Sequence, residues 1–340
     1  MPKNIVICCD GTSNDVVGVS TNVLKLYRCL VRSESQLTCY VPGVGTISDP
    51  SMKTGIGKWC SRKLNMGIGY GVRETACSIY RFLSNYFEPG DRIFLFGFSR
   101  GAYTVRSVAG MIRFLGLLRK EQIGLEPHAW SIYASDDQYL KKSEFFRAGN
   151  RFSKCFCTQP KPEIYFLGLW DTVSSFGWLW NLRTLPYTAN NRLVIHARHL
   201  VAMDERRAMF KQNLLTRNAR GKSFQEVWFP GSHGDIGGGW PNSVDGISRL
   251  ALKWMSQEAV ELGLEINPKE LARMIQPPDE QTAPKVRINH SLRGLWWILE
   301  FLPRRQWNSR CQRMTWTLPN FGKRRRIPNN AYQQSIRLDG

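Results

Sequence analysis

Short apolar runs alternate along this chain with longer segments whose apolar residues recur every three or four positions. Apolar runs of about four to eight residues between turn residues are typical of buried strands, whereas the longer recurrence is typical of helices. Residues 73–87 show the helical spacing most clearly and stop before Pro89, which cannot continue a helix. Strands are expected at residues 5–9, 37–41, 92–96, 164–169 and 226–229.

The alternation of strands and helices predicts an α/β fold with a mainly parallel, doubly wound sheet and helices on both faces. In such a sheet, ligands bind beyond the carboxyl ends of the strands, so polar residues there are the first candidates for a functional site. Four of the five expected strands are followed by such residues. These groups are Asp10-Gly11-Thr12, Gly97-Phe98-Ser99-Arg100-Gly101, Trp170-Asp171-Thr172 and Gly231-Ser232-His233-Gly234-Asp235.

Ser99 lies in the pattern G-x-S-x-G, between the third expected strand and an alanine- and valine-rich stretch. In a nucleophile elbow, the serine adopts a strained backbone conformation where a strand turns into a helix, and the small neighbours let the chain turn sharply. The expected strand and helix distinguish this match from surface turns that carry the same pattern by chance. Ser99 is therefore the candidate nucleophile.

Asp171 and His233 follow Ser99 in the serine, acid, histidine order of α/β-hydrolases. A serine hydroxyl is a weak nucleophile at neutral pH, so a neutral imidazole must accept its proton. A buried carboxylate fixes the tautomer of that imidazole and stabilises the imidazolium that forms. The sequence therefore predicts an α/β-hydrolase-like fold and a Ser-His-Asp triad that forms an acyl-enzyme.

Three other residues compete for these roles. His199 lies in residues 198–207, which we interpret as helical, so that its expected use is an ion pair at i, i+3 or i+4 spacing. Asp235, two positions after the candidate histidine, is an alternative acid or a brace for the following turn. Asp10 is the third candidate acid, and beside Gly11 its commoner role is to tie down the first loop by accepting backbone N–H bonds.

The oxyanion of a tetrahedral intermediate needs hydrogen-bond donors. Arg100 follows the candidate nucleophile and is expected to supply one backbone N–H, while Gly11 or Thr12 is expected to supply a second from the neighbouring loop. No cofactor or metal is expected. Residues 52–59 depart from a phosphate-binding loop, and residues 67–71 depart from a dinucleotide fingerprint.

The cysteines and the apolar runs indicate the compartment in which the protein is expected. Nine cysteines, an odd number without a C-x-x-C pair, indicate neither a zinc site nor a disulfide scaffold. The chain runs directly into its first strand without the apolar segment of a signal peptide, and no apolar run approaches the roughly 20 residues that span a bilayer. A cytoplasmic protein is expected. Export without a signal peptide and the oligomeric state stay open.

Basic residues gather toward the end of the chain. The formal net charge is +20, and residues 285–340 hold 12 basic and 2 acidic side chains, which is +10 for that segment. Trp296, Trp297, Arg304 and Arg305 suit peripheral contact with an anionic membrane. Ordinary packing with a solvated basic rim is the alternative, and nucleic acid is less favoured because no nucleic-acid motif frames the segment.

The 340 residues suit one catalytic domain with additions. We expect this domain over residues 1–285, with cap-like insertions at 117–156 and 176–193, where the strand alternation is interrupted. Residues 286–340 are expected to pack on the domain or extend it.

Several motifs occur in register: D-G-T, G-F-S-R-G-A, W-D-T-V, D-E-R-R and W-F-P-G-x-H-x-D-x-G-G-G. With them the chain resembles the α/β-hydrolase domain of type VI secretion lipase effectors, a family with many members of unassigned activity. The resemblance implies a phospholipase of the A1 or A2 type whose triad falls on Ser99, Asp171 and His233. It leaves open the headgroup, the acyl chain and the regioselectivity. The alternative is a catalytically silent protein of the same fold that binds anionic membrane or nucleic acid.

Overall fold

Seven parallel strands form the main sheet in the computed structural model, in the order β11-β8-β7-β4-β3-β1-β2. The structure describes residues 2–11, 19–43, 70–135, 142–173, 176–178, 181–183, 185–215, 223–241, 245–276, 287–294, 296–301, 304–308, 313–317, 321–325, 327 and 332–333. The strands are β1 (Asn4–Cys9), β2 (Gln36–Val41), β3 (Arg92–Phe98), β4 (Ile164–Trp170), β7 (Val194–Ala202), β8 (Ser223–Phe229) and β11 (Tyr332–Gln333).

All five expected strands are present, as β1, β2, β3, β4 and β8, and each is extended by up to three residues at one end. Strand β7 is the exception to the prediction. Residues 198–207 were expected to be helical, but the run up to Ala202 is the second half of β7. Its charges suggested pairing along one helix, whereas Arg198 instead reaches across to Glu258 of a neighbouring helix. The pairing lies between elements, so its spacing in sequence was misleading.

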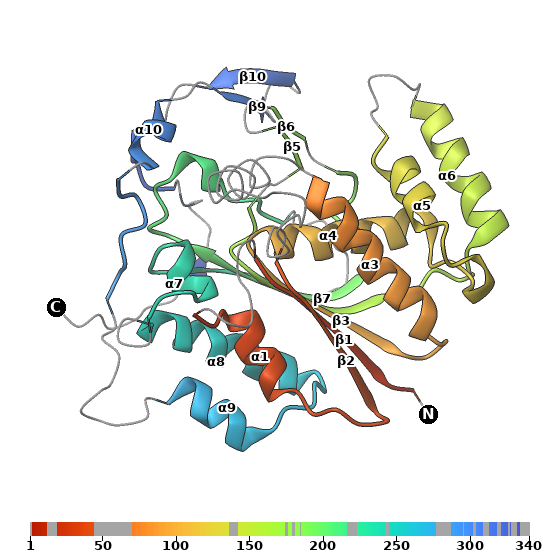
Figure 1. Ribbon diagram of the computed structural model, residues 1–340, viewed down its shortest axis with the longest axis horizontal. Helices are drawn as coiled ribbons and strands as arrows, with labels where there is room; N and C mark the ends of the chain where they lie inside the picture. The colour runs from red at the N-terminus through yellow and green to blue at the C-terminus, as the bar shows by residue number, and fades with distance from the viewer. Residues whose placement is uncertain are drawn as a thin grey trace, which may run out of the picture.

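Helices cover both faces of the main sheet (Figure 1). Alternate residues of β1 face opposite sides, with Ile5 and Ile7 in one apolar cluster and Val6 and Cys8 in the other. This arrangement confirms the expected doubly wound α/β class. One face carries α3 (Tyr70–Tyr86), α4 (Arg100–Leu115), α5 (Glu126–Tyr133) and α6 (Lys142–Phe156), and the other carries α1 (Asn22–Cys29), α7 (His233–Gly237), α8 (Gly246–Glu261) and α9 (Pro268–Ile275).

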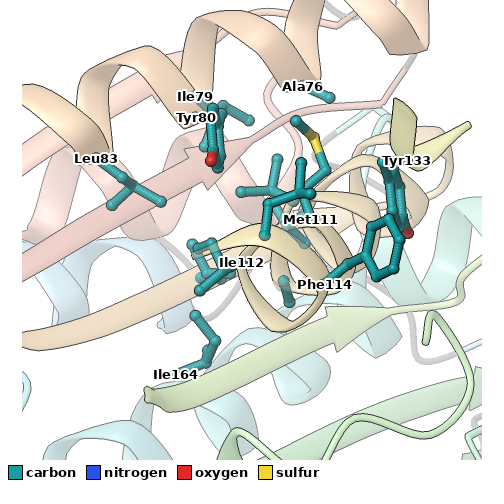
Figure 2. Packing of buried hydrophobic residues seen from close by; sticks show 14 of the residues in the cluster. Ala76, Ile79, Tyr80, Leu83, Met111, Ile112, Phe114, Tyr133 and Ile164 are labelled. Atoms are coloured by element: carbon teal, nitrogen blue, oxygen red, sulfur yellow. The ribbon is translucent and has the colours of Figure 1, made fainter. Parts of the chain in front are cut away.

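The core between α3, α4 and β4 explains why the helical spacing of residues 73–87 was readable in the sequence. The apolar side chains of α3 point at α4, as Figure 2 shows for Ile79, Tyr80 and Leu83. These three side chains are at most 1 % exposed. Tyr80 also donates its hydroxyl to the carbonyl of Gly116 at 2.7 Å, which satisfies the one polar atom of its ring.

The first expected insertion, residues 117–156, contains a 3-10 turn, η1 (Lys120–Gln122), and the helices α5 and α6. It packs against the carboxyl-terminal end of α4, where the rings of Phe114 and Phe145 stack with centroids 4.4 Å apart. Helix α4 is 16 residues long, which separates its two ends by roughly 24 Å. This stacking contact therefore lies at the end of α4 opposite to Ser99.

The second expected insertion joins residues from near the end of the chain. Its strands β5 (Phe176–Trp178) and β6 (Asn181–Arg183) form a four-stranded sheet with β9 (Arg304–Asn308) and β10 (Arg313–Thr317). The short helix α10 (Trp296–Glu300) packs on a 3-10 turn, η2 (Ala208–Phe210). Among the described residues, none of the helices has the length and apolar character needed to cross a membrane. Residues after 286 thus reach both sheets.

Candidate active site

Ser99 occupies the sharp turn between β3 and α4. Its φ of 57° and ψ of −121° lie in a region that residues other than glycine rarely adopt. Its backbone N–H donates to the carbonyl of Trp170 at 3.0 Å, so the end of β4 holds the turn in place. The strained serine is what the nucleophile-elbow pattern predicts at this position.

Two glycines make this turn sterically feasible. A Cβ at Gly97 would lie 2.7 Å from the Cα of Ala102, because strand and helix touch directly behind the turn. A Cβ at Gly101 would lie 2.3 Å from the carbonyl oxygen of Cys9 and 2.4 Å from that of Asp10. The G-x-S-x-G pattern therefore records two close backbone contacts, one within the elbow and one to the loop after β1.

Replacing Gly101 with alanine is expected to lower the free energy of unfolding by about 3 kcal/mol, because two backbone carbonyls would have to move. Urea unfolding checks this. Gly124→Ala is the comparison, since its Cβ would meet nothing within 4 Å and only its φ of 113° is unfavourable. An equal loss in the two variants would contradict the steric explanation.

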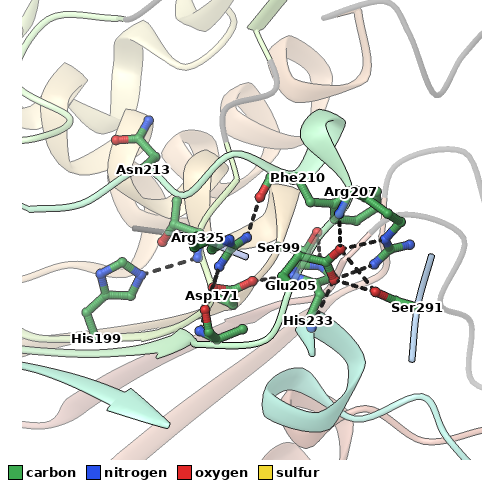
Figure 3. A network of polar contacts seen from close by, with 12 residues as sticks. Ser99, Asp171, His199, Glu205, Arg207, Phe210, Asn213, His233, Ser291 and Arg325 are labelled. Carbon is green, nitrogen blue, oxygen red and sulfur yellow. Dashed lines mark hydrogen bonds and ion pairs between the residues drawn. The ribbon is translucent and has the colours of Figure 1, made fainter. Parts of the chain in front are cut away.

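The structure brings together the three residues that the sequence placed on separate strand ends (Figure 3). Nε2 of His233 lies 2.8 Å from Oγ of Ser99, and Nδ1 of His233 lies 2.6 Å from Oδ2 of Asp171. Asp171 follows β4 with a φ of 38°, and His233 is the first residue of α7. All three residues are buried, and Asp171 is completely so.

Asp171 is held as a carboxylate by several partners. Its Oδ1 accepts the backbone N–H of Ala202 at 2.9 Å and an N–H of the Arg325 guanidinium at 2.5 Å. Burial alone raises the pKa of this carboxyl, but the charge of Arg325 and the hydrogen bond from His233 outweigh burial and hold the pKa well below its usual range. Asp171 is therefore ionised at neutral pH.

His233 is neutral at neutral pH in this setting. Burial lowers the pKa of its imidazole, and the bond to Asp171 opposes burial without reversing the net shift. With Nδ1 donating to Asp171, Nε2 is left as the acceptor toward Ser99. This is the protonation state that a general base requires.

A second buried carboxylate, that of Glu205, holds the backbone of His233. It accepts the backbone N–H of His233 at 3.1 Å, the hydroxyl of Ser291 at 2.9 Å and the side chain of Arg207 at 2.9 Å. Burial raises the pKa of Glu205, but its bonds to Arg207 outweigh this and bring the pKa to about 2. The sequence contained this residue in the motif D-E-R-R, but its role was not predicted.

Aromatic rings cover the histidine. The ring of Phe210 meets that of His233 edge-on with centroids 4.8 Å apart, and Trp296 of α10 meets Phe210 at 5.5 Å. The guanidinium of Arg207 lies 3.6 Å from the centroid of Phe210 and 4.9 Å from that of Trp296. Trp296, expected at a membrane surface or in packing, thus lies beside the candidate site.

His199 bonds to residues other than Ser99 and Asp171. Its Nδ1 lies 2.9 Å from Glu226 on β8, and its Nε2 accepts the backbone N–H of Thr172 at 3.2 Å. His199 therefore has a carboxylate partner, as expected, but the contact is a hydrogen bond between neighbouring strands and not an ion pair between residues one helical turn apart. The correction follows from β7, which replaces the expected helix.

The two alternative acids have structural partners. Asp235 accepts the backbone N–H of Ser232 at 2.8 Å and the side-chain amide of Asn289 at 2.6 Å, so it braces the start of α7. Asp10 accepts the backbone N–H of Gly11 and the hydroxyl of Thr21, each at 2.6 Å. It ties down the loop after β1, the commoner role expected for it. These hydrogen bonds of Asp235 and Asp10 go to residues other than His233.

The oxyanion donors stay predictions. Arg100 is the first residue of α4, where backbone N–H groups point out of the helix. The N–H of Gly11 donates to Asp10, and Thr12 lies outside the described residues. Within the described part of the chain, no group of three or more histidine, cysteine, aspartate or glutamate residues could hold a metal ion.

The fold and the Ser99–His233–Asp171 arrangement define an α/β-hydrolase-like protein. A model of the catalytic domain of Tle1-like phospholipase effectors of type VI secretion systems matches residues 3–258, and the chain belongs to this family. This confirms the resemblance seen in the motifs.

The chain is similar to the uncharacterised protein YEL023C of Saccharomyces cerevisiae, with 39 % identity over 225 residues, which are 63 % of this chain and 33 % of the relative. The match thus spans about a third of that relative. An uncharacterised protein from Pseudomonas aeruginosa shares 19 % identity over 83 % of this chain and 48 % of its own, with a TM-score of 0.45. The Tle1 effector bound to the VgrG spike shares 21 % over 71 % and 52 %, with a TM-score of 0.43.

Proposed function

We propose that the protein is a serine hydrolase that cleaves carboxylic ester bonds of phospholipids. Membership in a phospholipase effector family supports the substrate class. The observation that carries the reaction type is the continuous chain of hydrogen bonds from Ser99 through His233 to Asp171, with the serine at a strained elbow. A surface serine turn would need neither the strain nor the buried carboxylate.

In the proposed reaction, Oγ of Ser99 attacks the acyl carbonyl carbon while its proton passes to Nε2 of His233. Backbone N–H groups stabilise the oxyanion, with that of Arg100 as the leading candidate, since the N–H of Gly11 already donates to Asp10. The tetrahedral intermediate collapses as His233 returns the proton to the departing lysophospholipid oxygen. Water, deprotonated by the same nitrogen, then attacks the acyl-enzyme, and the fatty acid leaves with Ser99 restored.

We also propose that the end of the chain contacts an anionic membrane next to the site. Trp297 is 45 % exposed, Phe301 60 % and Trp316 64 %, and these apolar rings belong to a segment with a net charge of +10. Helix α10 carries Trp297 and Phe301 follows it, while Trp296 of the same helix packs over the candidate site through Phe210. A membrane held there would present lipid esters to Ser99.

The test is product analysis with vesicles of neutral phosphatidylcholine, alone or mixed with anionic phosphatidylglycerol. Mass spectrometry is expected to find fatty acid and lysophospholipid in equal amounts, released faster from the anionic vesicles. Neutral acylglycerols and a soluble ester complete the panel. Turnover of the soluble ester with no phospholipid product would reject the lipid substrate, and equal rates on both vesicles would reject the membrane contact.

A further inference from the structure

Arg325 reaches the candidate site from a distant part of the chain. Its side chain is 5 % exposed and bonds to Oδ1 of Asp171 at 2.5 Å and to the carbonyl of Ala202 at 3.3 Å. It also donates to the carbonyl of Phe210 (Figure 3). One guanidinium thus joins the acid after β4, the end of β7 and the turn that covers the histidine.

The neighbouring residue holds the same segment at a second point. Arg324 pairs with Oδ1 of Asp204 at 2.9 Å, and Oδ2 of Asp204 accepts the backbone N–H of Gly231 at 2.8 Å. The side chain of Arg324 is 60 % exposed, in contrast to the buried Arg325. Arg324 therefore anchors the segment at the surface, whereas Arg325 enters the site.

Four charged groups from three regions of the chain lie around His233 or around its partner Asp171, and their charges balance. Asp171 and Glu205 are negative, and Arg207 and Arg325 are positive. The uncharged neighbours of His233 include Ser99, Phe98 and Phe210. Without Arg325, this set would carry one net negative charge beside the imidazole, and a negative charge favours the imidazolium.

We infer that Arg325 is a positioning residue of this site: it fixes the Asp171 carboxylate and offsets its charge, so that Asp171 orients His233 without making it strongly basic. The inference rests on the proposed function for its kinetic consequences, but the effect on His233 is a property of the folded protein. Arg325 also lies beyond residues 3–258, the part of the chain that the family model matches.

The predicted signature is a change in pH dependence. His233 must be deprotonated to accept the proton of Ser99, so the acidic limb of kcat/KM reports its pKa in the free enzyme. Arg325→Gln should raise that pKa and move the acidic limb to higher pH. It should also lower kcat by about 10- to 100-fold, because the carboxylate loses one of its fixed partners.

The experiment compares the wild type with Arg325→Gln, Arg325→Lys and Arg324→Gln. The first measurement is kcat/KM for a soluble ester from about pH 5 to about pH 9, and the second is an NMR titration of the His233 imidazole. Arg325→Lys keeps the charge and should leave the acidic limb near that of the wild type. Arg324→Gln removes the neighbouring surface pair and should change neither measurement. Thermal unfolding verifies that each variant is folded at the assay temperature.

The outcomes separate the inference from the proposed function. A uniform fall in activity for Arg325→Gln, with no movement of the limb or of the His233 pKa, would mean that Arg325 only supports the fold. An equal shift in Arg324→Gln would assign the effect to the segment, not to the contact. If the wild type hydrolyses no ester, the proposed function fails, and the NMR titration still decides whether Arg325 acts on His233.

Discussion

Ser99→Ala is expected to lower kcat for ester hydrolysis by about 10⁶-fold, the order found when the nucleophile of a serine triad is removed. Alanine has no oxygen to form the acyl-enzyme, while His233 and Asp171 keep their bond to each other. The free energy of unfolding should stay near the wild-type value, because alanine meets the same backbone requirement as serine. Turnover of a p-nitrophenyl ester and labelling by a fluorophosphonate probe measure the loss.

Ser107→Ala is the matched control for this variant. Ser107 belongs to α4, the helix that follows Ser99, and is also buried, but its hydroxyl donates to the carbonyl of Tyr103 at 2.8 Å. Its loss should leave both turnover and labelling intact. Full activity in Ser99→Ala, or probe attached elsewhere than at Ser99, would reject the proposed nucleophile.

Asp171→Asn is expected to lower kcat by about 10⁴-fold, because an amide can donate to Nδ1 of His233 and stabilise the wrong tautomer. It also leaves the buried guanidinium of Arg325 without its carboxylate. Breaking a buried ion pair from one side should lower the free energy of unfolding by about 3–5 kcal/mol. Rates at saturating ester and urea unfolding curves at neutral pH measure the two effects separately.

Asp235→Asn distinguishes the two acids that the sequence left in competition. Asp235 bonds to Ser232 and Asn289, so its replacement should lower the free energy of unfolding by about 1–3 kcal/mol without removing the chemistry. A large loss of kcat in Asp235→Asn, together with an active Asp171→Asn, would reverse the assignment of the acid.

The positions of Ser99, Asp171 and His233 could be predicted because each lies at or within a few residues of the end of a strand. A parallel sheet brings the carboxyl ends of its strands to one edge, so three local patterns were enough to place three side chains close together. The glycines of the elbow were equally readable, since Gly97 and Gly101 record steric contacts that admit no side chain.

The supporting residues could not be predicted in the same way. Arg325 is one of four consecutive basic residues, and nothing local distinguishes it from Arg324, which stays at the surface. Glu205 lies just after β7, and this strand was missed because the spacing of the charged residues in 198–207 suggested a helix. Their roles depend on which backbone ends meet in three dimensions, and a single sequence carries no periodicity for such contacts.

The contact between Arg325 and Asp171 also orders events during folding. It joins residues that are 154 positions apart, so its loop-closure cost falls once the intervening strands β7 and β8 have paired, and we expect it to form after them. During synthesis, Ser99, Asp171 and His233 leave the ribosome well before Arg325. The hydrolase core can therefore assemble before its acid acquires the last partner, and full activity should lag behind the appearance of native secondary structure in a refolding experiment.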